Sequence, residues 1–130
     1  MFFSCPLAQN VLSWLQSLMF SFSPMCPVIL CRHVLFGFNC DELRAMPRIF
    51  VYLLNVCKLV IWHSRNDQRF RDIPPSAASV IIKVKTRVKL NLPLFFKRFK
   101  SARRQRYFHR QWGARGVVAS VAAGQLTLNL

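Results

Sequence analysis

The chain has 130 residues, of which 53% are apolar, and a formal net charge of +15. This length predicts one domain, and this apolar content excludes disorder through low hydropathy in the middle of the chain. The charge is uneven: residues 1–72 carry seven Lys or Arg and four Asp or Glu, whereas residues 73–130 carry twelve Lys or Arg and no acid. A solvated basic face usually mixes both signs, so the asymmetry favours a polyanionic partner over that alternative.

The cysteines and the apolar runs bear on the compartment. Five cysteines at uneven spacing do not form a disulfide framework, so we expect a reducing location, nuclear or cytoplasmic. A secretory signal is not predicted, because no Lys or Arg occurs in the first 31 residues and polar residues interrupt the apolar run. The apolar run over 49–62 is 14 residues long, which is short of the ~20 that a membrane span needs.

The first half of the chain predicts three helices. Apolar spacing indicates a helix over 7–22, which Pro24 and Pro27 terminate. A shorter apolar helix is expected over 28–38, ending near Gly37 and Asn39. Asp41 is predicted to cap the next helix, with Pro47 in or near the first turn of that helix. The candidates for burial in the short helix are Val28, Ile29, Val34, Leu35 and Phe38.

The strongest helical pattern covers residues 49–70. One broad stripe is apolar, and the Pro74-Pro75 pair follows the helix end. A second strip carries polar and aromatic side chains, for which a solvated edge and a ligand-facing surface are equally favoured. The apolar stripe consists of Ile49, Phe50, Leu53, Val56, Cys57, Val60 and Ile61, and the second strip consists of Asn55, Lys58, Trp62 and Arg65.

The second half begins with an ambiguous segment. Residues 82–92 alternate apolar and polar as a strand does, yet residues 77–88 also place their apolar side chains on one helix face. With Ser76 as an N-cap, we predict a helix that leaves Lys85 and Lys89 outward. Pro93 is predicted to open a further helix running to about Trp112, and a β-hairpin is predicted around residues 122–124.

These elements predict a mainly α fold of four to five helices with a small C-terminal β-hairpin. We expect one compact domain, with an apolar helical part over residues 1–72 and a basic helical part with the terminal hairpin over residues 73–130.

Several runs together carry a resemblance to a known family. They are CRHVLFGF at 31–38, PRIFVYLLN at 47–55, Ile61-Trp62 with Arg65-Asn66-Asp67, and LPLFFKRFKSARRQRYFHRQWGARG at 92–116. From about Cys5 to Leu130 the chain resembles the C-terminal extension of a non-LTR (LINE-type) retrotransposon polyprotein, downstream of its reverse transcriptase.

The resemblance implies a segment that helps to hold template RNA and target DNA during target-primed reverse transcription. A zinc-binding segment ending in a His-then-Cys pattern commonly precedes the extension, and Phe2-Phe3-Ser4-Cys5 looks like its last step. We therefore expect an N-terminally truncated fragment of a larger protein, with RNA or DNA and the polymerase part of the polyprotein as partners. The polymerase aspartate motif does not occur in the chain, so the family's catalysis is not expected here.

Metal binding and catalysis are both disfavoured by spacing. Cys26, Cys31, His33 and Cys40 lack the close cysteine pairs that zinc sites use most readily, so buried free thiols are favoured. The four carboxylates are Asp41, Glu42, Asp67 and Asp72, and a two-metal site needs such groups to converge. Asp41-Glu42 suits a helix N-terminus, and Asp67 suits a local ion pair with Arg65 or Arg69. We expect no enzyme, metal or cofactor.

Nucleic-acid binding is the chemistry that the basic half favours. Cations at this density repel one another unless a polyanion lies beside them, and the interleaved rings offer faces for stacking on bases. Tyr107, Phe108 and Trp112 are stacking candidates with core packing as the alternative, whereas core packing is favoured for Phe95, Phe96 and Phe99. The predicted nucleic-acid-binding residues are Lys83, Lys85, Arg87, Lys89, Lys97, Arg98, Lys100, Arg103, Arg104, Arg106, Tyr107, Arg110, Trp112 and Arg115.

The functional hypothesis is sequence-nonspecific RNA or DNA binding without catalysis, since phosphate contacts carry no base information. Two alternatives stay open. One is a basic protein associated with a membrane surface, with its cations on anionic lipid and its rings among the headgroups. The other is a decayed reading frame without a selected role.

Overall fold

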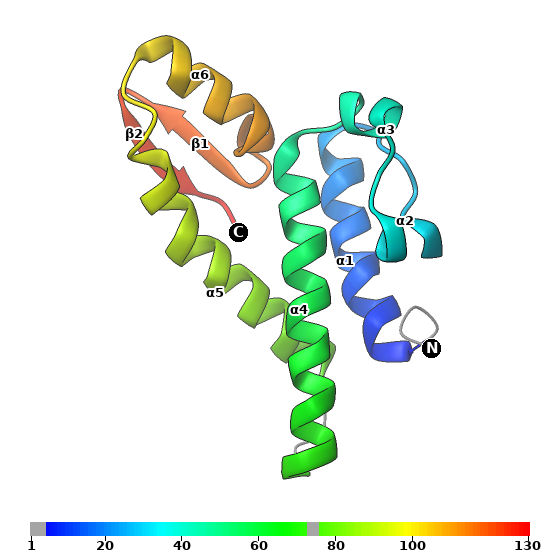
Figure 1. Ribbon diagram of the computed structural model, residues 1–130. Coiled ribbons are helices and arrows are strands. Elements are labelled where there is room, and N and C mark those ends of the chain that lie inside the picture. The colour runs from blue at the N-terminus through cyan, green and yellow to red at the C-terminus, as the bar shows by residue number, and fades with distance from the viewer. Residues whose placement is uncertain (1–4, 73–75) are drawn as a thin grey trace.

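Helices dominate the computed structural model, which describes residues 5–72 and 76–130 (Figure 1). Phe2-Phe3-Ser4 and the Pro74-Pro75 pair lie outside the described residues. The predicted class, mainly helical with a C-terminal hairpin, is confirmed. In chain order the elements are α1 (Pro6–Phe22), α2 (Cys31–Phe36), α3 (Cys40–Arg44), α4 (Arg48–Arg71), α5 (Ala77–Phe96), α6 (Ala102–Gln111), the 3-10 turn η1 (Ala114–Gly116), β1 (Ala119–Ala122) and β2 (Gln125–Leu128).

The core forms where α1, α4 and α5 pack together. Every residue of the apolar stripe expected on α4 is buried, and α1 buries Val11, Leu12, Leu15 and Met19 against it. α5 contributes Val80, Val84 and Val88, each fully buried. This spacing of four residues, and not the alternation of a strand, determines the conformation of the segment. The side-chain oxygen of Ser76 accepts from the backbone N–H of Ser79, which confirms the expected N-cap.

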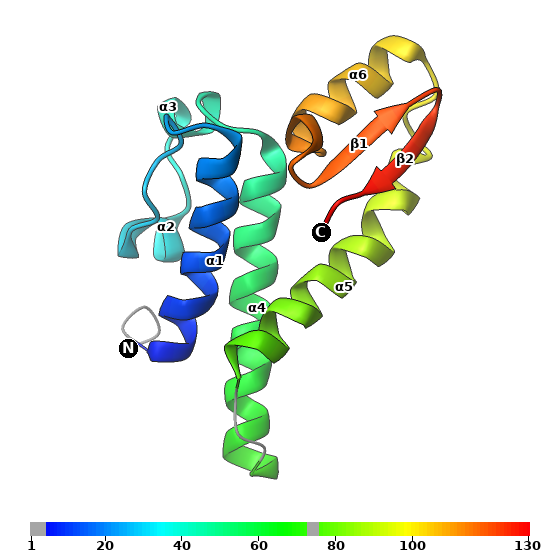
Figure 2. The same cartoon turned by 180° about the vertical axis from the view of Figure 1, so that it is seen from behind.

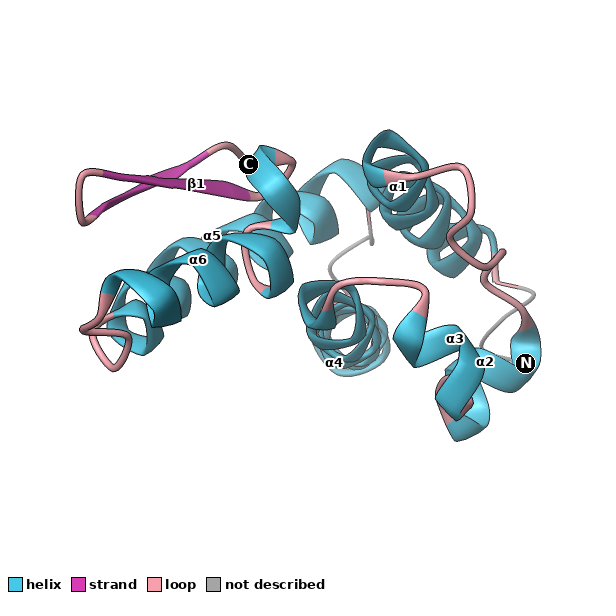
Figure 3. Ribbon diagram, turned by 90° about the horizontal axis from the view of Figure 1, so that it is seen from above, coloured by secondary structure: helices cyan, strands magenta, loops and turns pink. Residues whose placement is uncertain are grey.

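α4 separates the short helices from the C-terminal elements. α2 and α3 lie on one side of α4, and α6 and the hairpin lie on the other, while α5 contacts both α4 and α1 (Figures 1 and 2). α5 passes close to the C-terminal half of α4 and then diverges from it toward the other end (Figure 1). Seen from above, α6 and the hairpin lie on the same side of α4 as most of α5, apart from α1 (Figure 3).

The chain between α1 and α4 differs from the prediction. Residues 28–30 are not helical, and the helix expected over 28–38 is limited to α2. Val28 and Leu35 are exposed rather than buried, whereas Ile29 and Val34 are buried as expected. The physical reason is a pair of hydrogen bonds to α1: the Ile29 N–H donates to the Gln16 side-chain oxygen at 2.6 Å, and the Gln16 amide donates to the Pro27 carbonyl at 3.2 Å, which holds this segment in an extended conformation.

Asp41 does not cap the helix that contains Pro47. It lies inside the short separate helix α3, which accounts for a sixth α-helix among the described residues. The α3 cap is Asn39, whose side-chain oxygen accepts from the Glu42 N–H at 2.8 Å, while the Glu42 carboxylate accepts from the Asn39 N–H at 3.1 Å. This reciprocal capping box satisfies two backbone donors, which a cap at Asp41 does not provide.

Pro93 does not open a helix. It lies within the last turn of α5, and the break comes later, before Ser101 caps α6 by accepting from the Arg104 N–H. A proline near a helix end removes one backbone hydrogen bond, and burial of Leu92 and Phe96 on either side offsets that loss. The break at 97–101 releases Lys97, Arg98 and Lys100 into a loop.

The terminal hairpin forms as predicted. β1 and β2 pair antiparallel, with Ala122 opposite Gln125, so that Ala123 and Gly124 form a two-residue turn. Both turn residues have positive φ, 53° and 74°, as a type I′ turn requires. Gly113 joins α6 to this hairpin: its carbonyl accepts from the Val118 and Ala119 N–H groups, and a Cβ there would collide with the Ala119 carbonyl. A glycine is therefore required at this approach of two backbones.

Candidate nucleic-acid interface

A groove runs along the junction of α4 and α5. One wall is a ridge of α5 side chains spaced four residues apart, which lie on one helix face. They are Lys83, Arg87, Asn91 and Phe95. The other wall is the edge of α4 between Arg48 and Asp67, which is roughly 28 Å long at the rise of an α-helix. Two hollows lie along this junction, and a third, between α3, α4 and α6, adjoins them through Tyr52 and Trp112; together we call the three hollows the α4–α5 groove.

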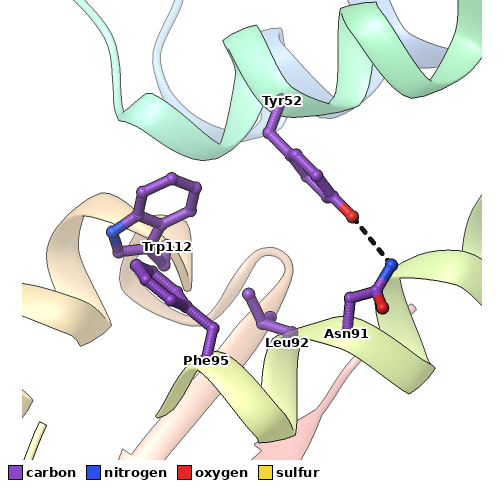
Figure 4. A pocket seen from close by; sticks show the side chains of 5 residues that line it. All are labelled: Tyr52, Asn91, Leu92, Phe95 and Trp112. Carbon is purple, nitrogen blue, oxygen red and sulfur yellow. Dashed lines mark hydrogen bonds between the residues drawn. The ribbon is translucent and has the colours of Figure 1, made fainter. Parts of the chain in front are cut away.

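The middle hollow is aromatic. Its volume is about 340 Å³, and its lining comes from α4, α5 and the residue that follows α6: Tyr52, Asn91, Leu92, Phe95 and Trp112 (Figure 4). The Trp112 ring packs edge to face against two other rings: its centroid lies 4.9 Å from that of Phe95 and 6.5 Å from that of Tyr52. The Asn91 amide donates to the Tyr52 hydroxyl at 3.2 Å. The hollow is thus an apolar cavity with a polar pair at its edge.

An adjoining hollow of about 710 Å³ extends toward the N-terminus of α4. It shares Tyr52 and Trp112 with the aromatic hollow, and it adds the guanidinium groups of Arg44 and Arg48 and the ring of Tyr107. The Gln111 side chain accepts from the Arg48 N–H at 3.2 Å, which joins the end of α6 to the start of α4. This end of the groove therefore combines two arginines with three aromatic rings.

The third hollow, about 460 Å³, lies toward the C-terminal half of α4. Val60, His63 and Asp67 of α4 face Lys83, Thr86 and Arg87 of α5. Asp67 is the one carboxylate among the residues that line the three hollows, whereas Arg44, Arg48, Lys83 and Arg87 are cationic. The groove consequently carries a net positive charge on either side of the uncharged aromatic hollow.

The predicted phosphate-binding residues are solvent-accessible. All except Lys85 are exposed, and over 5–72 and 76–130 none of the twelve basic side chains from Lys83 to Arg115 pairs with a carboxylate. The ion pairs that do form join Arg32 and His33 to Glu42, and Arg44 to Asp41. The positive charges of the second half are thus not neutralised by carboxylates of the described residues.

α6 orders three of these arginines. The sequence gives α6 basic residues in nearly all directions, but Arg103, Arg106 and Arg110 follow the spacing of one helix face, and all three are exposed. The Arg110 guanidinium lies 5.7 Å from the centre of the Tyr107 ring, which lines the groove. We call these three residues the α6 ridge. It adjoins the aromatic end of the groove.

Several predicted residues lie away from the groove. Lys85 is not fully outward: it is half-buried, with its ammonium 5.8 Å from the Trp14 ring of α1. Arg115 lies in η1 over Phe22 at 5.8 Å. Lys97, Arg98 and Lys100 occupy the α5–α6 loop, Lys89 is exposed on α5, and Arg104 is exposed on α6. These positions form a basic surround and do not line the three hollows.

The aromatic candidates separate by burial. Phe108 is fully buried, and Phe96 is nearly so, which leaves them in the core. Tyr107 and Trp112 are half-exposed and line the groove. Phe95 belongs to both environments, since it packs on Phe99 at 5.1 Å and also lines the aromatic hollow.

Several groove residues were missing from the sequence prediction. Among them, Arg44, Arg48, Tyr52 and Asn91 come mostly from the weakly charged first half, where no local density of charge marks them. A signal was present on α4, where Arg48, Tyr52 and Asn55 recur at spacings of four and three on the polar edge. The pattern of one helix does not show which other helix packs beside that edge, because this depends on the tertiary structure.

The other two chemistries considered for this chain gain no support from the side-chain positions. Within the described part of the chain, no three His, Cys, Asp or Glu side chains are grouped as metal ligands. Asp41 and Glu42 lie on α3, near the start of α4, whereas Asp67 and Asp72 lie at its far end. Across residues 5–72 and 76–130, Asp67 forms no ion pair with Arg65 or Arg69, contrary to expectation.

Two further findings concern the chain as a whole. Among the helices that the structure describes, none has the length together with the hydrophobicity that crossing a bilayer requires. Comparison of the chain with models of known families, with characterised proteins and with solved structures gave no match.

Proposed function

We propose that this chain binds RNA or DNA without sequence specificity and without catalysis of its own. The observation that carries the proposal is that, in the described part of the chain, eleven of the twelve basic side chains from Lys83 to Arg115 are exposed and none pairs with a carboxylate, and that a groove lined by rings lies beside several of them. Phosphate is the anion whose regular spacing suits such a set, and aromatic faces accept bases of any sequence. The resemblance of the sequence to a LINE-type C-terminal extension supports the same function, with the polymerase part of such a polyprotein as a further partner.

Binding to a single-stranded oligonucleotide at several salt concentrations tests this proposal. If about six phosphates engage basic side chains, the log–log slope of affinity against salt is about −4 on a single strand and about −5 on a duplex. Two oligonucleotides of unrelated sequence and equal length are expected to give similar affinities and slopes. An affinity that does not respond to salt would reject the proposal.

One observation favours a second candidate, an anionic lipid surface. Ile82, Leu90 and Leu94 are 63%, 66% and 61% exposed on one side of α5, and Lys83 and Lys89 lie close to them along the helix. Such a combination is typical of helices that lie in the membrane interface. Flotation with vesicles containing phosphatidylserine, with and without competing oligonucleotide, separates the two: under the nucleic-acid proposal, the oligonucleotide removes the protein from the vesicles.

A further inference from the structure

We infer that the aromatic hollow between Tyr52, Asn91, Phe95 and Trp112 receives one unstacked nucleobase of a single strand. The inference rests on the proposed function and makes it more specific, because it names single-stranded nucleic acid as the ligand class and places one base. The hollow is built from both halves of the chain, because Tyr52 belongs to the first half, whereas Asn91, Phe95 and Trp112 belong to the basic second half.

The shape and chemistry of the hollow suit a flat heterocycle. At about 340 Å³ it is near the small end of the ~300–1,000 Å³ range of pockets for small organic groups. Leu92 is 3% exposed and forms an apolar floor, while the rings of Tyr52, Phe95 and Trp112 form the sides. Aromatic side walls over an apolar floor stabilise a base by stacking and by exclusion of water.

The edge of the hollow offers hydrogen bonds to a base. The Asn91 amide uses one donor on the Tyr52 hydroxyl, which leaves its carbonyl oxygen and a second N–H unused by that contact. The Tyr52 hydroxyl, which accepts from Asn91, retains its own proton for donation. This pair presents both donors and an acceptor, so it satisfies polar atoms on the edge of any base and does not select one.

The charge on either side favours a nucleotide over an uncharged apolar ligand. Arg44 and Arg48 line the neighbouring hollow toward the start of α4, and Lys83 and Arg87 line the hollow in the other direction. A strand lying along the groove therefore meets cations before and after the hollow. Bases in a duplex are stacked and paired, and taking one out costs free energy, so an unpaired strand supplies a base to this hollow at the lowest cost.

The test compares (dT)10 with a ten-unit abasic deoxyribose-phosphate chain, which has the same phosphates and no bases. Fluorescence anisotropy at fixed salt is expected to show that the wild-type protein prefers (dT)10 by about 5- to 150-fold, the range for one base stacked on aromatic side chains. Two uncharged variants address the hollow: Tyr52→Leu removes a wall, and Asn91→Trp fills the space from an exposed helix position. Both are expected to reduce the preference to nearly onefold while the salt dependence stays unchanged.

The control is Trp62→Leu, which removes a 56% exposed ring from α4 outside the hollow and is expected to keep the preference. Circular dichroism establishes that each variant is folded, and Asn91→Trp carries the test if Tyr52→Leu is not. Equal wild-type affinity for the two oligomers, a preference that survives a folded hollow variant, or one that Trp62→Leu also abolishes would overturn the inference while leaving the proposed function intact. Failure of the wild type to bind either oligomer would overturn both.

Discussion

His33 is a buried polar residue for which the sequence predicted no partner. Its side chain is 1% exposed, and both ring nitrogens are engaged. The Leu30 N–H donates to Nδ1 at 2.8 Å, so the ring proton is on Nε2, which donates to the Glu42 carboxylate at 2.6 Å. No lone pair is left for a metal. The histidine that was considered together with three cysteines as a zinc ligand instead connects α2 to α3 through Glu42.

Glu42 gives this contact a dependence on pH. The pKa of Glu42 lies below its ordinary value, chiefly because the Asn39 N–H donates to the carboxylate, with the hydrogen bond from His33 adding to the effect and burial opposing it. A carboxyl whose pKa is lowered on folding adds stability above its unfolded pKa, and that stability is lost as pH falls through the folded pKa.

We therefore predict that Glu42→Gln lowers the free energy of unfolding at pH 7 and that the difference from wild type shrinks below about pH 4.5. Urea unfolding of both proteins between pH 7 and pH 3.5 measures this, with Arg32→Gln distinguishing the exposed ion pair. A difference of constant size over the whole range would contradict the role assigned to the carboxylate.

At the scale of elements, the β-hairpin turn is not optimal. Ala123 has a φ of 53°, a left-handed conformation that costs an alanine energy and that asparagine tolerates better. We predict that Ala123→Asn raises the free energy of unfolding by roughly 0.5–1 kcal/mol, because it produces the Asn-Gly pair that type I′ turns prefer.

Thermal unfolding measures that gain. The matched control is Ala122→Asn, one residue earlier at an exposed position of β1, where asparagine disfavours the strand and no gain is expected. If both substitutions stabilise the protein equally, the turn conformation is not the cause.

Elements with strong internal patterns were predictable, and their ends were not. α1 and α4 follow from apolar spacing almost to the residue, because a single buried stripe determines them. The end of α5 was misplaced at Pro93, since the burial of Leu92 and Phe96 depends on neighbours that a local pattern does not include. Val28 was misassigned for a similar reason: its segment is fixed by Gln16, thirteen residues from Ile29 in the chain.

At the scale of the whole molecule, the sequence contained the basic and aromatic residues but not the place where they come together. The charge asymmetry and the interleaved rings are properties of composition, so they needed no structure. The α4–α5 groove depends on how elements from different halves of the chain pack together, which brings Arg48 and Tyr52 of α4 beside Trp112. This is why the predicted set included the α6 ridge and omitted one wall of the groove.

If the chain binds nucleic acid as proposed, we expect the α6 ridge to be a principal phosphate contact and the C-terminal end of α4 to contribute little. Arg65, Arg69 and Arg71 are also exposed, yet they lie at the end of α4 that is farthest from α6 (Figure 1). Two triple variants, one at each place, each remove three positive charges. A comparison of the two therefore shows whether the position of the charges, and not only their number, affects binding.

The most direct measurement is the salt dependence of single-strand binding for Arg103→Gln/Arg106→Gln/Arg110→Gln beside Arg65→Gln/Arg69→Gln/Arg71→Gln. If the α6 ridge engages three phosphates, the first variant makes the log–log slope less negative by about 2, and the second changes it by less than about 1. Equal changes in the two variants, or an unchanged slope in the first, would contradict the account.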